Sequence, residues 1–144
     1  MAVFSERQIE MEVNTSFGPI DIAISGLQAQ QKNIDLISSN VANAQSTDNG
    51  NGEPYRRLEA VFKTDGDGMG GVTLDEIVPD MSNFQKILKP GNPNADEQGY
   101  VKMPNVKVPI EMMNLNIAAR AYQANTAILK RYQQMVETTL ELLK

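Results

Sequence analysis

Five residues in the middle of the chain have the spacing of a calcium-binding loop. Positions 1, 3, 6, 9 and 12 of an EF-hand loop are matched by Asp65, Asp67, Gly70, Thr73 and Glu76. The match is partial, because position 5 is Met69, which offers no side-chain oxygen, and because Pro79 stands where the exit helix would form. An acidic, glycine-rich hairpin loop accounts for the same residues. We predict that loop rather than a calcium site.

The composition contains few of the residue types that enzymes use for catalysis. The chain has no His and no Cys, so the commonest general base, the thiolate nucleophile and the usual ligands of zinc, haem and iron–sulfur clusters are missing. Asp96 and Glu97 are adjacent carboxylates without a second acidic pair, and no glycine-rich phosphate loop occurs. We expect a protein that is not an enzyme, with no catalytic residue, metal, cofactor or small-molecule substrate.

The charge of the chain argues against two classes of partner. Thirteen basic and 18 acidic residues give a net charge of −5, which is the wrong sign for nucleic acid or an anionic membrane surface. No eighteen apolar residues follow one another, so we expect no membrane insertion. Glu6, Glu10 and Glu12 stand where a secretory signal needs basic and then apolar residues. We therefore expect no cleaved signal peptide.

The elements that position these residues are two long helices and an irregular middle. Six of the seven prolines lie in 54–109 and eight of the ten glycines in 50–99, which predicts a mainly α fold with a small β insert. We expect an N-terminal extension and helix in 1–47, with the helix at about 18–46, a small β-rich outer subdomain in 48–109, and a C-terminal helix in 110–144. Strands are predicted at Tyr55–Lys63, Val72–Val78 and Tyr100–Val108.

Both helices carry apolar seams that predict pairing as a coiled coil. In the C-terminal helix the seam repeats every seven residues, at Leu115, Tyr122, Leu129, Val136 and Leu143. The N-terminal helix carries Ile24, Leu27, Ile34, Ile37 and Val41, three, four or seven residues apart. The neighbouring lines of the C-terminal helix are also largely apolar, so one antiparallel helix would leave part of that face exposed. We therefore expect neighbouring subunits to cover the rest.

Short runs of residues match a known pattern in the same order. The N-terminal helix contains Ser-Gly-Leu at 25–27 and Asn-Val-Ala-Asn-Ala at 40–44, and the C-terminal helix contains Arg-Ala-Tyr-Gln-Ala-Asn at 120–125. The middle contains Pro-Tyr-Arg-Arg at 54–57 and a run with four prolines and glycines between 90 and 99. Together these resemble the bacterial flagellar basal-body rod protein family, and in particular its proximal rod members.

The resemblance implies a structural subunit of the bacterial flagellum, needed for its assembly and for motility. Members of the family build a hollow helical tube that transmits torque, with the terminal helices inside and the middle segment outside. The implied location is the basal body in the periplasmic space, reached by type III export. The implied partners are other rod proteins, further copies of the chain and the flagellar export apparatus.

We predict that subunit contacts use the seams of both helices and asparagines from the matching runs. The predicted contact residues are Ile24, Leu27, Ile34, Ile37, Asn40, Val41, Asn43, Leu115, Tyr122, Asn125, Leu129, Tyr132, Val136 and Leu143. A cytoplasmic coiled-coil adaptor or scaffold protein is the alternative, because it would share the same seams. That alternative leaves the matching runs at both ends unexplained.

Overall fold

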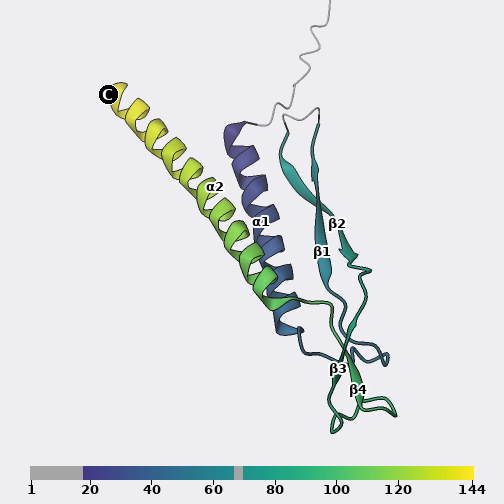
Figure 1. Ribbon diagram of the computed structural model, residues 1–144. Coiled ribbons are helices and arrows are strands. Elements are labelled where there is room, and N and C mark those ends of the chain that lie inside the picture. Colours follow the sequence, from purple (N-terminus) through teal and green to yellow (C-terminus); the bar gives the residue numbers. More distant parts are fainter. Residues whose placement is uncertain (1–17, 67–69) are drawn as a thin grey trace, which may run out of the picture.

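A computed structural model describes residues 18–66 and 70–144. Along the chain, two β-hairpins lie between an N-terminal and a C-terminal helix (Figure 1). The elements are α1 (Pro19–Ala42), β1 (Leu58–Thr64), β2 (Val72–Pro79), β3 (Gln85–Leu88), β4 (Tyr100–Met103) and α2 (Val108–Leu142). The predicted mainly α fold with a small β insert is thus confirmed in outline. The N-terminal extension, residues 1–17, lies outside the described residues.

The elements form three layers with α1 in the middle (Figure 1). α1 packs on α2 on one side and on β1 and β2 on the other. The two helices run antiparallel, and the β3–β4 hairpin lies near the end where α1 stops and α2 starts (Figure 1). The positions of α2, β1 and β2 are therefore set by their contacts with α1.

Local sequence explains where α1 begins and ends. Pro19 occupies the first turn, and the Gly18 N–H donates to Asp21 Oδ2 at 3.1 Å, which satisfies an amide that the helix leaves free. The helix ends at Ala42, four residues before the predicted end. Asn43 donates through its side-chain amide to the Ser39 carbonyl at 2.9 Å. This local bond competes with the backbone pattern of the helix and favours a turn there.

α2 begins two residues earlier than predicted. Its first residue is Val108, and Pro109 lies in the first turn rather than before it. A proline is tolerated there because the amides of the first turn have no partner within the helix. The helix has 35 residues against 24 in α1, or about 52 Å against 36 Å at 1.5 Å per residue. Part of α2 must therefore extend beyond α1.

The two hairpins correct the predicted strands in detail. β1 pairs with β2 in antiparallel register, with an irregularity between Val61 and Phe62. The strands on both sides of the acidic loop confirm the predicted hairpin, although Asp67 and Met69 lie outside the described residues. β3 has no counterpart among the predicted strands, because its sequence, Gln-Lys-Ile-Leu, does not alternate polar and apolar residues. All four of its residues are exposed. β4 ends at Met103, five residues before the predicted strand does.

The core formed by the described residues is small. Its buried apolar side chains are Ala23, Ala29, Ile37, Tyr55, Val101, Met103 and Ala118. Only one comes from α2, although that helix carries eleven large apolar residues that are exposed, from Val108 to Leu142. One antiparallel helix thus leaves much of the apolar face of α2 uncovered, as predicted. Neither described helix combines length with enough apolar character to cross a membrane.

At Gly26 the two helices come so close that only a glycine fits. A Cβ atom there would stand 2.7 Å from Asn125 Nδ2, closer than real Cβ contacts come. A side chain at position 26 would therefore push the two helices apart or displace the Asn125 amide. This accounts for a glycine inside a helix, where it is about 1 kcal/mol less favourable than alanine.

This contact predicts that Gly26→Ala has different effects on the free energy of unfolding in two backgrounds. In the unchanged chain the gain in helix propensity is offset by the clash, so the free energy of unfolding in urea should change little. In an Asn125→Ala background the clash is gone, and Gly26→Ala should stabilise the chain by about 1 kcal/mol. An equal gain in both backgrounds would show that the helices do not meet closely at this position.

Candidate assembly interface and its polar anchor

One asparagine on α1 makes every hydrogen bond that its side chain allows. The Asn40 amide donates to the Leu58 carbonyl at 2.8 Å and to Glu111 Oε2 at 3.2 Å. Its oxygen accepts from the Tyr55 hydroxyl at 2.9 Å and from the Leu58 N–H at 3.0 Å. An asparagine side chain has two donors and room for two acceptor bonds, so Asn40 is fully satisfied. It joins α1, the start of β1 and the first turn of α2.

Glu111, one of the partners of Asn40, also forms a buried ion pair. Glu111 is completely buried, and its Oε1 accepts from Arg57 Nε at 2.6 Å. The Arg57 side chain is 18% exposed and also pairs with Glu59 and, at 3.5 Å, with Asp80 Oδ2. A buried carboxylate without partners would be strongly destabilising. Glu111 is therefore compatible with its site only while Arg57 and Asn40 remain in place.

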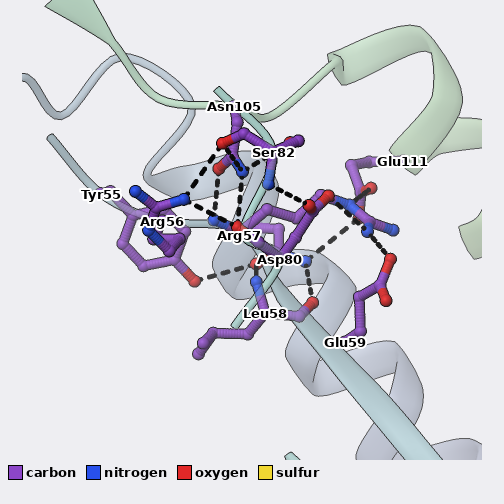
Figure 2. Close-up of polar contacts among 10 residues, drawn as sticks. Tyr55, Arg56, Arg57, Leu58, Glu59, Asp80, Ser82, Asn105 and Glu111 are labelled. Atoms are coloured by element: carbon purple, nitrogen blue, oxygen red, sulfur yellow. Dashed lines mark hydrogen bonds and ion pairs between the residues drawn. The ribbon is translucent and has the colours of Figure 1, made fainter. Parts of the chain in front are cut away.

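The remaining members fix the segment that precedes β3 (Figure 2). The Asn105 amide donates to the Asp80 carbonyl at 2.8 Å, and its oxygen accepts from the Arg57 N–H at 2.8 Å. The Ser82 N–H donates to Asp80 Oδ1 at 2.8 Å. We call Asn40, Tyr55, Arg57, Asp80, Asn105 and Glu111 the polar anchor. It ties both helices to both hairpins at one end of the molecule.

The charges in the polar anchor stabilise each other's ionised forms. Burial lowers the pKa of Arg57, but hydrogen bonds and charges from Glu111 and Glu59 outweigh it, and the pKa lies above its ordinary value. Hydrogen bonds from Ser82, followed by the charge of Arg57, hold the pKa of Asp80 below its ordinary value. Both residues therefore remain charged near neutral pH, as the ion pairs require.

A cleft lies between α1, α2 and β1, next to the polar anchor. Its volume is about 310 Å³, and its lining includes Gln30, Leu36, Phe62 and Ile117. Gln30 Oε1 is buried and has no hydrogen-bond partner among the described residues. No group of three acidic side chains that could hold a metal ion occurs in 18–66 and 70–144. Arg57 and Glu111 of the polar anchor also line this cleft.

The predicted contact residues fall into three groups by exposure. Ile37 and Asn40 are buried inside the chain itself. Eight are half-buried, namely Leu27, Ile34, Val41, Asn43, Leu115, Asn125, Leu129 and Tyr132. The other four, Ile24, Tyr122, Val136 and Leu143, are exposed. Of the whole set, the Asn40 side chain contacts the first turn of α2 and Asn125 lies against Gly26; that these residues contact other subunits remains a prediction.

Sequence reasoning missed most of the polar anchor. In the sequence, Tyr55 and Arg57 stand out only as part of a matching run, and no motif includes Glu111. One signal was available: Glu111 is the only acidic residue between Glu97 and Glu137. A lone acid at the start of a largely apolar helix is also explained by the helix dipole, so the signal by itself does not distinguish a buried ion.

Comparison with known proteins finds the same pattern at both ends of the chain. Residues 20–49 match the family described as flagella basal body rod protein, and residues 97–142 match that described as flagellar basal body rod FlgEFG protein C-terminal. The flagellar basal-body rod protein FlgC of Salmonella typhimurium is 43% identical over 125 residues, which are 85% of this chain and 93% of that protein. This chain belongs to the FlgC family of flagellar basal-body rod proteins.

FlgC proteins of lower identity match a similar share of this chain. FlgC of Agrobacterium fabrum is 40% identical over 85% of this chain and 91% of its own length. FlgC of Aquifex aeolicus is 36% identical over 89% of this chain and 97% of its own length. The two segments that match rod families contain Asn40 and Glu111, whereas Tyr55, Arg57 and Asp80 lie between them. In this FlgC-family chain the polar anchor thus joins both matching segments to the insert.

The ion pair predicts different costs for the same substitution at two glutamates. Glu111→Gln removes the charge that faces Arg57 and places an amide donor near the Asn40 amide, so unfolding free energy should fall by about 2 kcal/mol or more. Glu59→Gln is the matched control, because Glu59 pairs with the same arginine but is 49% exposed. It should cost less than about 1 kcal/mol. Similar small losses in urea unfolding for both variants would show that Glu111 does not hold Arg57.

The lowered pKa of Asp80 predicts how stability changes in acid. A carboxyl group whose pKa is lower in the folded chain stabilises fully above its unfolded value, for which the reference is 3.8. That contribution is lost as the pH falls from this value towards the folded one. Asp80→Asn should therefore be less stable than the unchanged chain at pH 7, and the difference should narrow below pH 4. Urea midpoints measured from pH 7 to 3 test this, and a constant difference would contradict it.

Proposed function

We propose that this chain is a non-catalytic structural subunit that assembles with copies of itself and with other rod proteins into a hollow helical tube that transmits torque. The observation that carries the proposal is the uncovered apolar face of α2, taken together with membership of the FlgC family. Exposed apolar patches of this extent are uncommon on proteins that act alone. A seam that meets a different surface of the next subunit builds an open helical assembly rather than a closed oligomer.

The register of the helix pair locates the uncovered end of α2. Asn40 contacts Glu111, and Gly26 lies against Asn125, so a shift of 14 residues along α1 matches 14 along α2. The same register places Pro19, the first residue of α1, opposite Tyr132. About ten residues of α2 then extend beyond α1, or about 15 Å. All residues from 133 to 144 are exposed.

In the proposed assembly this overhang pairs with helices of neighbouring subunits as a coiled coil. Val136 and Leu143 continue the heptad seam there and are 39% and 79% exposed. Leu115 and Leu129 of the same seam are half-buried where α1 lies alongside. The seam therefore serves contacts within the chain at one end and would serve contacts between chains at the other.

We extend the proposal to the arrangement of the tube. The segments 1–47 and 110–144, which contain the two helices, would form its inner part and residues 48–109 its outer part, in the basal body where it crosses the periplasmic space. The subunit would reach that position through the flagellar export apparatus without a cleaved signal peptide. Membership of the rod family supports these points, and the marginal core described above suits a chain that crosses a channel unfolded and is stabilised by its neighbours.

The proposal predicts that a charge in the exposed seam stops assembly and not export. Val136→Asp should remove the subunit from isolated basal bodies and abolish motility, because burial of a valine contributes about 1.5 to 3 kcal/mol at most and a buried aspartate is strongly unfavourable. Gln134→Asp is the control, since it adds the same charge on the opposite face of the helix. Export is measured in the culture medium. Normal motility with Val136→Asp would contradict the proposed interface.

A further inference from the structure

The turn after α1 contains two asparagine–glycine pairs whose glycine amides share one acceptor. The pairs are Asn49–Gly50 and Asn51–Gly52. The Gly50 N–H donates to Asp48 Oδ1 at 2.8 Å, and the Gly52 N–H donates to the same oxygen at 3.0 Å. All five residues of this run, 48–52, are exposed to solvent. Each of the two amides is the nitrogen that follows an asparagine.

Asparagine–glycine pairs have a specific chemical weakness. The backbone nitrogen of the glycine loses its proton to a water-borne base and attacks Cγ of the preceding asparagine. The new N–Cγ bond closes a five-membered succinimide, the Cγ–Nδ2 bond breaks, and the amide nitrogen leaves as ammonia after taking up a proton. Water then opens the ring at either carbonyl and yields aspartate or isoaspartate. Glycine favours the attack because it has no side chain to obstruct it.

The observed hydrogen bonds oppose the first step of this reaction at both sites. A proton held by a carboxylate is harder to remove, because the negative charge of Asp48 disfavours a second negative charge on the nitrogen beside it. The bonds also hold both nitrogens towards Asp48 instead of towards the asparagine side chains. The turn fixes the glycines at φ of +90° and +79°, and the Asn49 N–H donates to the Glu53 carbonyl at 2.8 Å across it.

We infer that Asn49 and Asn51 are latent deamidation sites and that the Asp48 carboxylate protects both by binding the two attacking amides. Asp48 is a positioning residue in this role. The inference rests on the geometry of the turn and does not depend on the proposed function of the chain. This protective role of Asp48 is additional to turn formation, which by itself explains an exposed aspartate at such a position.

Deamidation here would affect the polar anchor. The turn connects α1 to Tyr55, whose N–H donates to the Ser46 carbonyl at 2.9 Å and whose hydroxyl binds Asn40. Isoaspartate adds one carbon to the backbone between α1 and Tyr55, and either aspartate or isoaspartate adds a negative charge. A change at residue 49 or 51 would therefore alter the connection that aligns Tyr55 with Asn40.

The test compares deamidation rates in the full chain at pH 7.4 and 37 °C. Peptide mass spectrometry follows the gain of about one dalton at residues 49 and 51 and separates aspartate from isoaspartate. Asp48→Ala should deamidate about tenfold faster at these two sites than the unchanged chain, because it loses hydrogen bonds to a charged acceptor. Glu53→Gln is the matched control, since it removes a carboxylate from the same turn, and its rate should stay at the level of the unchanged chain.

Two further measurements keep the result interpretable. The unchanged chain unfolded in urea should deamidate at least as fast as folded Asp48→Ala, and amide hydrogen exchange at Gly50 and Gly52 should accelerate in that variant. Circular dichroism shows that the variant is folded; if it is not, the folded and unfolded rates of the unchanged chain decide the question. Equal rates in the folded and unfolded chain, or equal rates in Asp48→Ala and Glu53→Gln, would overturn the inference.

Discussion

The buried contact between Asn40 and Glu111 is the constraint on which the rest of the molecule depends. Asn40 is 1% exposed and Glu111 is fully buried, so each would be strongly destabilising in any arrangement that left it unpaired. Their pairing fixes where α2 starts relative to the end of α1. From that point the antiparallel register follows, and 14 residues further along both helices it brings Gly26 against Asn125. A single polar contact thus sets the alignment of a pair of helices along its whole length.

Hydrophobic burial alone would not impose this register. Ile37 and Ala118 are buried between the elements, but most large apolar side chains of α2 are exposed. A heptad seam tolerates a slip by one repeat, since the same residue types return every seven positions. A slip would separate Glu111 from Asn40 and leave Arg57 without its buried partner. The polar anchor therefore supplies specificity at the start of α2, while apolar residues along the whole helix supply packing surface.

This division explains what the sequence predicted and what it did not. The period of the apolar residues predicted both helices, and the prolines and glycines predicted the insert between them. The end of α1 and the start of α2 differ from the prediction by four and two residues. Periodicity registers neither the bond from the Asn43 side chain to the Ser39 carbonyl nor the fit of Pro109 to a first turn. The four exposed residues of β3 carry no pattern. The polar anchor was missed because its members are distant in sequence: 71 residues separate Asn40 from Glu111, and 54 separate Arg57 from Glu111.

The same division is suited to the proposed assembly. A subunit in a helical tube must keep one internal geometry while its outer contacts repeat around and along the tube. Polar contacts tolerate little displacement, because a hydrogen bond weakens steeply as its angle departs from linear. Apolar contacts tolerate more, because burial has no preferred direction. A chain whose polar anchor is hydrogen-bonded internally and whose apolar seam is exposed at Val136 and Leu143 is therefore closely defined in its internal contacts and adaptable where it would meet its neighbours.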